Sequence, residues 1–311
     1  MTSKRARSPA AAGDSRAAAA ATSVDVPQAG KDAADDPIVI HINEPIDAAA
    51  GRQLRRVGTG QYAAPFVVDD GEFLQLHFTM RYTQSRMSLR SPDTLSLDYT
   101  RRMMACLLFQ PAPMHVEIVG LGGGSLTKFC YYELPHTRVT TIEVDDKVIG
   151  MSHLFRVPAP CARLSIVHAD AAEYFQNRAQ TRAHSADVVL VDGCDVHGIA
   201  PALATEGFYR SVRDRLRPDG VMVVNLVGAN SIKDAAQRSI AKVFEDQFLL
   251  MNAVVGGNRI ALAFRGANWP PRWAAIKAAA PELGQKHRLD LPGYAESLER
   301  WYRNRGRKMP R

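Results

Sequence analysis

The stretch that determines the fold is "HVEIVGLGGGSLTKFCYYEL", residues 115–134. Its first part, "HVEIVGL", is a short apolar run with β-branched residues, which predicts a buried strand. The glycines of "GGGS" predict a tight loop, and "LTKFCYYEL" predicts a helix. A strand, a glycine-rich loop and a helix in this order are typical of the first unit of a parallel α/β sheet.

The same alternation of strand and helix continues along the chain. Strands are predicted at "RVTTIEV", "RLSIVHAD", "ADVVLVD" and "DGVMVVNLV", each followed by a segment with helical apolar spacing. Right-handed crossovers then produce a largely parallel sheet that helices cover on both faces. The last strands, "QFLLMNAVV" and "RIALAFR", are joined by a short turn and must pair antiparallel. We therefore predict an α/β fold with a Rossmann-like, methyltransferase-type sheet, mostly parallel and ending in an antiparallel hairpin.

The segments outside this sheet predict a division of the chain into four parts. Residues 1–36 lack the apolar pattern of a core and are expected to be a disordered leader. Residues 37–91 contain short alternating strands and predict a small N-terminal β-hairpin domain. Residues 92–270, which begin with a helix expected over 92–109, predict a Rossmann-like nucleoside-binding catalytic domain. Residues 271–311 predict a basic helical C-terminal tail, whose end "ERWYRNRGRKMPR" is expected to be a solvated terminal helix.

Composition excludes several classes of protein. No apolar run approaches the roughly 20 residues that a membrane span needs, and the N-terminus lacks the apolar core of a secretory signal. The four cysteines show no C-x-x-C spacing, so disulfides and a metal centre are not expected, and a cytoplasmic location fits. The net charge of +7 comes largely from the C-terminal end, "ERWYRNRGRKMPR", and without a nucleic-acid motif a nucleic-acid partner is not expected.

Polar and glycine residues follow the predicted strands where a nucleotide-type ligand binds in such sheets. After the first strand come Gly120, Gly122, Gly123, Gly124 and Ser125, which allow a tight turn and a close approach to a ligand. The loop does not have the G-x-G-x-x-G spacing of a dinucleotide site.

Two acids complete the predicted nucleoside site. Glu143 ends the second strand about twenty residues after the loop, where a carboxylate accepts hydrogen bonds from two ribose hydroxyls. Asp170 ends the third strand and is placed to accept from an adenine amino group, with the backbone N–H of Ala171 beside it. Helix capping is the alternative interpretation of Asp170.

Two further acids follow the fourth strand, in "VVLVDGCDVHG". Asp192 and Asp195 lie three residues apart, where the buried strand gives way to a segment rich in turn formers. A purely structural alternative interpretation is that Asp192 ends the strand and Asp195 forms an Asx turn near Gly198.

Several of these segments, in order, resemble the spermidine synthase (polyamine aminopropyltransferase) family. The resemblance rests on "GLGGGS", "IEVDDKVI", "HADAAEYF" and "ADVVLVDGCDVHG", followed by "TEGFY". It implies a spermidine synthase-like transferase that moves an aminopropyl group from decarboxylated S-adenosylmethionine to a polyamine acceptor such as putrescine. It further implies a homodimer, no permanently bound cofactor, a catalytic role for Asp192 and Asp195, and donor contact by Gln84. In such a reaction, Asp192 and Asp195 would attract and orient the protonated amine, and Asp192 would receive its proton.

Three departures from the family pattern leave alternatives open. Ser125 stands where the family has an acid that holds the donor's amino group. The segment "LSLDYTRR" replaces the family's Y-H-E segment, and Val196 replaces a proline after the second acid. The alternatives are an S-adenosylmethionine-dependent methyltransferase and a non-catalytic nucleoside-binding homologue.

Overall fold

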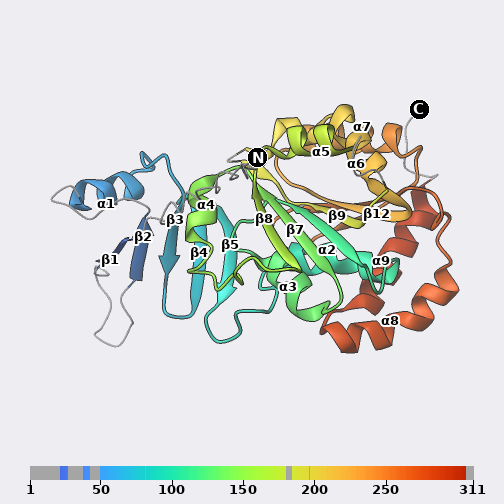
Figure 1. Cartoon of the computed structure of the whole chain (residues 1–311), viewed down its shortest axis with the longest axis horizontal. Helices are drawn as coiled ribbons and strands as arrows, with labels where there is room; N and C mark the ends of the chain where they lie inside the picture. Colours follow the sequence, from blue (N-terminus) through green and yellow to red (C-terminus); the bar gives the residue numbers. More distant parts are fainter. Residues whose placement is uncertain are drawn as a thin grey trace, which may run out of the picture.

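The computed structural model describes residues 22–26, 38–42, 50–80, 82–179, 184–195 and 197–305. Within these ranges, helices and strands form a small N-terminal sheet at one end of the molecule and a larger α/β unit beside it (Figure 1). None of the helices in the described ranges combines the length and the apolarity that a membrane crossing requires.

The larger unit is built on a seven-stranded sheet with the order β13-β14-β12-β9-β6-β7-β8. The five strands from β12 to β8 pair in parallel, whereas β14 is antiparallel to both of its neighbours. The mostly parallel sheet with a terminal antiparallel hairpin is therefore confirmed. The strands are β6 (His115–Val119), β7 (Arg138–Glu143), β8 (Leu164–His168), β9 (Ala186–Val191), β12 (Leu216–Leu226), β13 (Phe248–Asn252) and β14 (Arg259–Phe264).

Helices cover both faces of this sheet (Figure 1). Since β9 is central, all six of its side chains are buried, and those from Val188 to Val191 alternate between two apolar cores. Val189 and Val191 face the core formed with α5, α6 and α7. The helices are α2 (Asp98–Met103), α3 (Ser125–Glu133), α4 (Asp146–Met151), α5 (Ala171–Ala179), α6 (Glu206–Arg215), α7 (Asn230–Val243), α8 (Trp273–His287) and α9 (Leu291–Asn304), with short 3-10 segments η1 (Met104–Leu108) and η2 (Pro201–Ala204).

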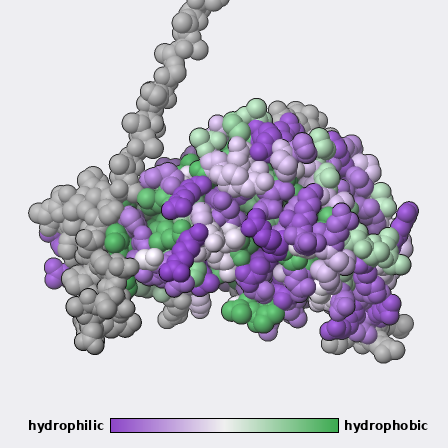
Figure 2. Space-filling model, turned by 90° about the horizontal axis from the view of Figure 1, so that it is seen from below, coloured by the Kyte–Doolittle hydropathy of each residue, from purple (hydrophilic) through white to green (hydrophobic). Residues whose placement is uncertain are grey.

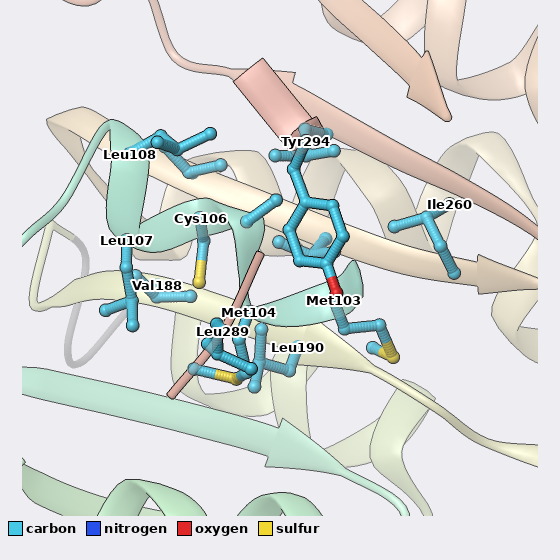
Figure 3. Close-up of a cluster of buried hydrophobic side chains, with 14 of the residues drawn as sticks. Met103, Met104, Cys106, Leu107, Leu108, Val188, Leu190, Ile260, Leu289 and Tyr294 are labelled. Carbon is cyan, nitrogen blue, oxygen red and sulfur yellow. The ribbon is translucent and has the colours of Figure 1, made fainter. Parts of the chain in front are cut away.

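Val188 and Leu190 face the opposite core, which Figure 3 shows in close-up. There they join side chains from η1 and from the C-terminal part of the chain, including Leu289 and Tyr294. The predicted tail is therefore packed against this core over α8 and α9, while Arg300, Arg303 and Asn304, in the part predicted to be solvated, are exposed. Helix α9 buries Leu291, Tyr294, Ala295 and Leu298, whose i, i+3, i+4, i+7 spacing forms one apolar stripe.

The helix expected over residues 92–109 is shorter than predicted. It begins only at Asp98 and continues as the 3-10 segment η1. The preceding carbonyl groups accept from side chains instead of from a helical backbone: Arg101 donates to the carbonyls of Leu95 and Ser96 at 2.8 and 3.1 Å. This arrangement holds the segment before α2 in an irregular conformation, and α2 itself brings Tyr99 and Thr100 to the cavity described below.

The small N-terminal sheet has five antiparallel strands in the order β1-β2-β3-β4-β5. It extends the predicted hairpin, and its first strand lies in the segment predicted as a disordered leader. The leader prediction is wrong for this strand, because Thr22–Val26 pairs its backbone with Ile38–Ile42. The rest of the predicted leader lies outside the described residues. The elements are β1 (Thr22–Val26), β2 (Ile38–Ile42), α1 (Ala50–Gly58), β3 (Phe66–Asp69), β4 (Phe73–Thr79) and β5 (Tyr82–Ser88).

The N-terminal sheet is attached to the larger unit through a third apolar cluster. Leu76 and Met87 from β4 and β5 pack with Val148, Met151 and Phe155 from α4 and the residues after it. This contact brings the first half of β5 next to the glycine-rich loop. On the face that Figure 2 shows, the described surface is mostly hydrophilic, as expected when the apolar side chains fill these cores.

Candidate active site

A cavity of about 570 Å³ lies where the carboxyl ends of the parallel strands meet the N-terminal sheet. It is the position at which open α/β sheets bind their ligands. Nine of the predicted site residues line it: Gln84, Gly120, Gly122, Ser125, Glu143, Asp170, Ala171, Asp192 and Asp195. The structure therefore brings together residues that lie more than 100 positions apart in the chain.

Gly120 allows the loop after β6 to touch the end of β9. Its φ of 90° is a left-handed conformation that side chains disfavour, and a Cβ here would lie 2.4 Å from the backbone oxygen of Asp192. The predicted nucleoside loop and the predicted catalytic acid are therefore in direct backbone contact.

Gly123 and Gly124 do not line the cavity, so the prediction that they bind the ligand is not supported by the geometry. They instead permit close packing behind the loop: a Cβ on Gly124 would lie 2.3 Å from Cγ2 of Val157. A Cβ on Gly123 would lie 2.8 Å from Cδ1 of Phe155. These two glycines hold the loop against the segment after α4.

Glu143 is the most heavily hydrogen-bonded acid of the cavity. Its Oε1 accepts from the backbone N–H groups of Val144 and Asp145 at 2.8 and 2.9 Å, and its Oε2 accepts from Leu121 N–H at 2.8 Å. Because each carboxylate oxygen has two lone pairs, one acceptor position remains on Oε2. Glu143 thus orients the glycine-rich loop and has room to accept from one ribose hydroxyl rather than the predicted two.

Asp170 caps helix α5, as its alternative interpretation predicts. Its Oδ1 accepts from the backbone N–H groups of Ala172 and Glu173 at 2.7 and 3.1 Å. The residue is exposed and also lines the cavity next to Ala171. Its second oxygen, Oδ2, is not used by the cap, so the two interpretations are compatible.

Asp192 is held by two side chains on opposite sides. Asn225, near the end of β12, donates its Nδ2 to Oδ1 at 2.8 Å, and the hydroxyl of Tyr99 in α2 donates to Oδ2 at 3.2 Å. Burial raises the pKa of Asp192 to about 6, although the hydrogen bonds from Asn225 and Tyr99 oppose this rise. Burial and the neighbouring Asp192 carboxylate raise the pKa of Tyr99 well above its usual value, so its hydroxyl stays protonated and donates.

Asp195 forms the Asx turn of its alternative interpretation. Its Oδ1 accepts from the backbone N–H groups of His197 and Gly198 at 2.7 and 3.1 Å. The turn joins β10 (Cys194–Asp195) to β11 (Gly198–Ile199). Oδ2 is not used by the turn, and Asp195 lines the cavity beside Asp192.

Gln84 and Cys194 connect the two units of the chain across the cavity. The Cys194 thiol donates to Oε1 of Gln84 at 3.2 Å. Burial, followed by the nearby carboxylates, raises the pKa of Cys194 to about 12, so the thiol stays protonated and is not a nucleophile at neutral pH. Gln84 lies on β5, so the N-terminal sheet supplies part of the cavity wall.

Sequence reasoning missed two residues of this site, Tyr99 and Asn225. Tyr99 lies within "LSLDYTRR", the segment that replaces the family's Y-H-E segment, and this position was the available signal. Asn225 is a polar residue in "VMVVNLV", an otherwise apolar strand, and that exception was the available signal.

The arrangement can bind a nucleoside at one end and an amine at the other. Glu143 and Asp170 offer acceptors at the ends of β7 and β8, while Asp192 and Asp195 place two carboxyl groups at the end of β9. Gly120 brings the two ends together through its contact with the backbone of Asp192. The buried Asp192, with a pKa of about 6, is suited to proton transfer near neutral pH.

Known proteins resemble this chain in sequence. Residues 98–252 match the family model described as "Spermine/spermidine synthase domain". The polyamine aminopropyltransferase of Neisseria meningitidis serogroup A is 32% identical over 258 residues, covering 82% of this chain and 96% of the relative.

Two solved structures share the fold. A spermidine synthase in complex with the transition state analogue AdoDATO has a TM-score of 0.57 and 22% identity, covering 75% of this chain and 80% of that one. Human methyltransferase-like protein 13 in complex with SAH has a TM-score of 0.52 and 23% identity, covering 69% of this chain and 94% of that one.

Proposed function

The chain belongs to the spermine/spermidine synthase family, and on that premise we propose that it transfers an aminopropyl group from decarboxylated S-adenosylmethionine to a polyamine such as putrescine. The observation that carries the proposal is the buried Asp192, supported by Asn225 and Tyr99 and in contact with the loop that would hold the nucleoside. No permanently bound cofactor is part of the proposal, since the donor is consumed in each turnover. The predicted homodimer and cytoplasmic location stay predictions.

The proposed reaction is an in-line displacement at the carbon beside the donor's sulfonium. The amine nitrogen forms the new C–N bond with its lone pair, and the C–S bond electrons return to sulfur, which leaves as methylthioadenosine. The amine must first lose a proton, and its pKa is near that of lysine, about 10. Asp192 and Asp195 attract the protonated amine to the cavity, and Asp192 orients the amine and accepts its proton.

The raised pKa of Asp192 makes this proton transfer easier than the sequence predicts. With an ordinary aspartate the pKa gap to an amine is about six units, whereas with a pKa of about 6 it is about four. The transfer is still uphill, so the orientation of the amine must supply part of the rate enhancement. The hydrogen bonds from Asn225 and Tyr99 favour the carboxylate form, which must be present when the amine binds.

The experiment that tests the proposal measures turnover and binding with both donors. Purified protein with putrescine and decarboxylated S-adenosylmethionine is expected to release methylthioadenosine and a longer polyamine in equal amounts. Calorimetric titration with each donor and with methylthioadenosine reports binding without turnover. Nucleoside binding without aminopropyl transfer would contradict the proposed reaction, and failure to bind any of the three ligands would exclude both enzymatic functions.

A methyltransferase is the second candidate, because Ser125 replaces the acid that the family is expected to use for donor selection. Ser125 is the first residue of α3 and lines the cavity. Its hydroxyl can bond to intact or decarboxylated S-adenosylmethionine. Release of S-adenosylhomocysteine in the same assay, with a methylated product, would favour this candidate.

Ser125→Asp is expected to shift donor preference toward decarboxylated S-adenosylmethionine. A carboxylate here attracts the ammonium of either donor but repels the carboxylate that only the intact donor carries. One contact of this kind corresponds to roughly 1–3 kcal/mol, or about five- to a hundredfold. The measurement is the ratio of the two dissociation constants at fixed salt. Ser125→Asn, which adds similar bulk without charge, is the control, and an unchanged ratio in the aspartate variant would contradict the prediction.

A further inference from the structure

The turn between β13 and β14 forms hydrogen bonds to elements that surround Asp192. Asp98, next to Tyr99 in α2, accepts from Val254 N–H at 2.7 Å. Lys233 in α7 donates to the carbonyl of Gly257 at 2.8 Å. Asn258, the last residue before β14, donates its Nδ2 to Oδ1 of Asn225 at 2.9 Å. No catalytic role predicted from the sequence involves this turn.

The third of these hydrogen bonds begins a relay, a chain of two hydrogen bonds that runs from Asn258 through Asn225 to Asp192. Asn258 donates to Asn225, and Asn225 donates through its own Nδ2 to Oδ1 of Asp192 at 2.8 Å. Asn258 and Asn225 are only 8% and 4% exposed, so water has little access to the two amides. An amide group left unpaired at such a site is costly, and its orientation is therefore set by the protein.

The direction of the relay matches the ionised form of Asp192. A carboxylate only accepts hydrogen bonds, so Asn225 must turn its NH₂ group toward Asp192 and its oxygen toward Asn258. The NH₂ group of Asn258 meets that oxygen. In the opposite orientation of Asn225, two acceptors would face each other at Asp192 and two donors would face each other at Asn258.

We propose that Asn258 is a positioning residue, which fixes the amide of Asn225 in the orientation that stabilises the Asp192 carboxylate. The proposal rests on the proposed function, in which Asp192 must be ionised to receive the amine. Gly256 makes room for the arrangement, because a Cβ at this residue would lie 2.8 Å from Oδ1 of Asn258. The relay gives the hairpin turn, which lies at the far end of the domain sequence, an influence on the reacting group.

Other charged or titratable groups face Asp192 and must be separated from the relay in a test. Tyr99 donates to it from α2, and Cys194 interacts with it electrostatically from β10. Asp195 and Glu143 act on the same cysteine and line the same cavity. None of these groups is bonded to Asn258, so a change at Asn258 should reach Asp192 only through Asn225.

The test is the pKa of the Asp192 carboxyl in ligand-free protein, followed by carbon-13 NMR and assigned with Asp192→Asn. Asn258→Leu removes the donor without adding charge. It is expected to raise the pKa of Asp192 by about 0.4–1 unit, the equivalent of one net hydrogen bond. The acid limb of the kcat/KM profile should move to higher pH by the same amount, and activity at high pH should approach that of the wild type.

Two further variants make the test specific. In an Asn225→Leu background, Asn258→Leu should not change the pKa of Asp192 any further, as a double-mutant cycle requires of a relay. Lys233→Met is the matched control, since it releases the same turn from α7 without touching Asn225, and it should leave the pKa unchanged. If Asn258→Leu does not fold, Asn258→Ala is titrated in the same way.

The outcomes distinguish failure of the Asn258 relay from failure of the proposed aminopropyl transfer. An unchanged pKa of Asp192 in a folded Asn258 variant overturns the relay, and so does an equal rise in the Asn225→Leu background or in Lys233→Met. The NMR titration needs no substrate. A shifted pKa in a protein that transfers no aminopropyl group would therefore support the relay while contradicting the proposed function.

Discussion

Asp192→Asn is expected to lower aminopropyl transfer by a factor on the order of 10² or more, as is usual for loss of a positioned acid–base group. The amide retains the size of the side chain and can still bond to Asn225 and Tyr99. It cannot attract a protonated amine or accept its proton. The measurement is kcat/KM for the polyamine at saturating donor, together with the dissociation constant of methylthioadenosine.

Nucleoside affinity and a variant of the neighbouring acid provide the controls for Asp192→Asn. Affinity for methylthioadenosine should remain within a few-fold of the wild type, because Glu143 lies on a different strand from the substitution. Asp195→Asn, which keeps an oxygen for the Asx turn, is the comparison for a neighbouring acid and should lose less activity. Full transferase activity in Asp192→Asn would show that this acid does not receive the proton.

Asp192→Asn should also make the folded state more stable at neutral pH. The pKa of Asp192 is about 6 in the folded protein and ordinary in the unfolded chain, so the folded state holds the proton more tightly. Stability contributed by this group is therefore present below pH about 4 and lost as the pH rises through about 6. Asparagine does not titrate and carries no such penalty. Above pH about 6, the free energy of unfolding of Asp192→Asn should therefore exceed that of the wild type by roughly 1–3 kcal/mol. Loss of activity with a higher melting temperature would identify an acid retained for function.

Much of the catalytic sheet could be predicted because the relevant signals are local. Apolar runs such as "ADVVLV" end at turn-forming residues, and the carboxyl ends of parallel strands meet at one edge. From this rule alone, Glu143, Asp170 and Asp192 are expected to share one cavity, and they do. The departures from the family pattern at Ser125 could likewise be read from the loop sequence.

What could not be predicted depends on contacts between distant segments. Tyr99 and Asn225 reach Asp192 from elements 93 and 33 residues away, and which side chain bonds to which oxygen follows only from their packing. The C-terminal helices contain the apolar stripe of a packed element, but the basic charges around it favoured a solvated interpretation. Thr22–Val26 pairs as an edge strand through its backbone, which composition does not reveal.

Glu143→Gln is expected to weaken the binding of every adenosyl ligand by about 10²-fold, more than the loss of one ribose contact alone. The carboxylate uses three of its four acceptor positions on backbone N–H groups. A glutamine oxygen can satisfy Val144 and Asp145, but its NH₂ group then faces the N–H of Leu121. Two donors would meet at the start of the glycine-rich loop, and the remaining acceptor for a ribose hydroxyl would be lost. A single lost bond to a charged group corresponds to roughly 1.5–3 kcal/mol, and displacement of the loop adds to it.

The measurement is the dissociation constant of methylthioadenosine, by calorimetry at fixed pH and salt, in wild type and variant. Asp145→Asn is the matched control, because it removes one charge from the same cavity wall while asparagine can still cap α4 through the bond to Lys147 N–H. It should change the affinity only a few-fold. Because the N–H of buried Leu121 would lose its acceptor, Glu143→Gln should also lower the melting temperature, whereas Asp145→Asn should not. Equal affinities in Glu143→Gln and wild type would mean that the nucleoside does not lie at the ends of β6 and β7, and the cavity would need a different ligand.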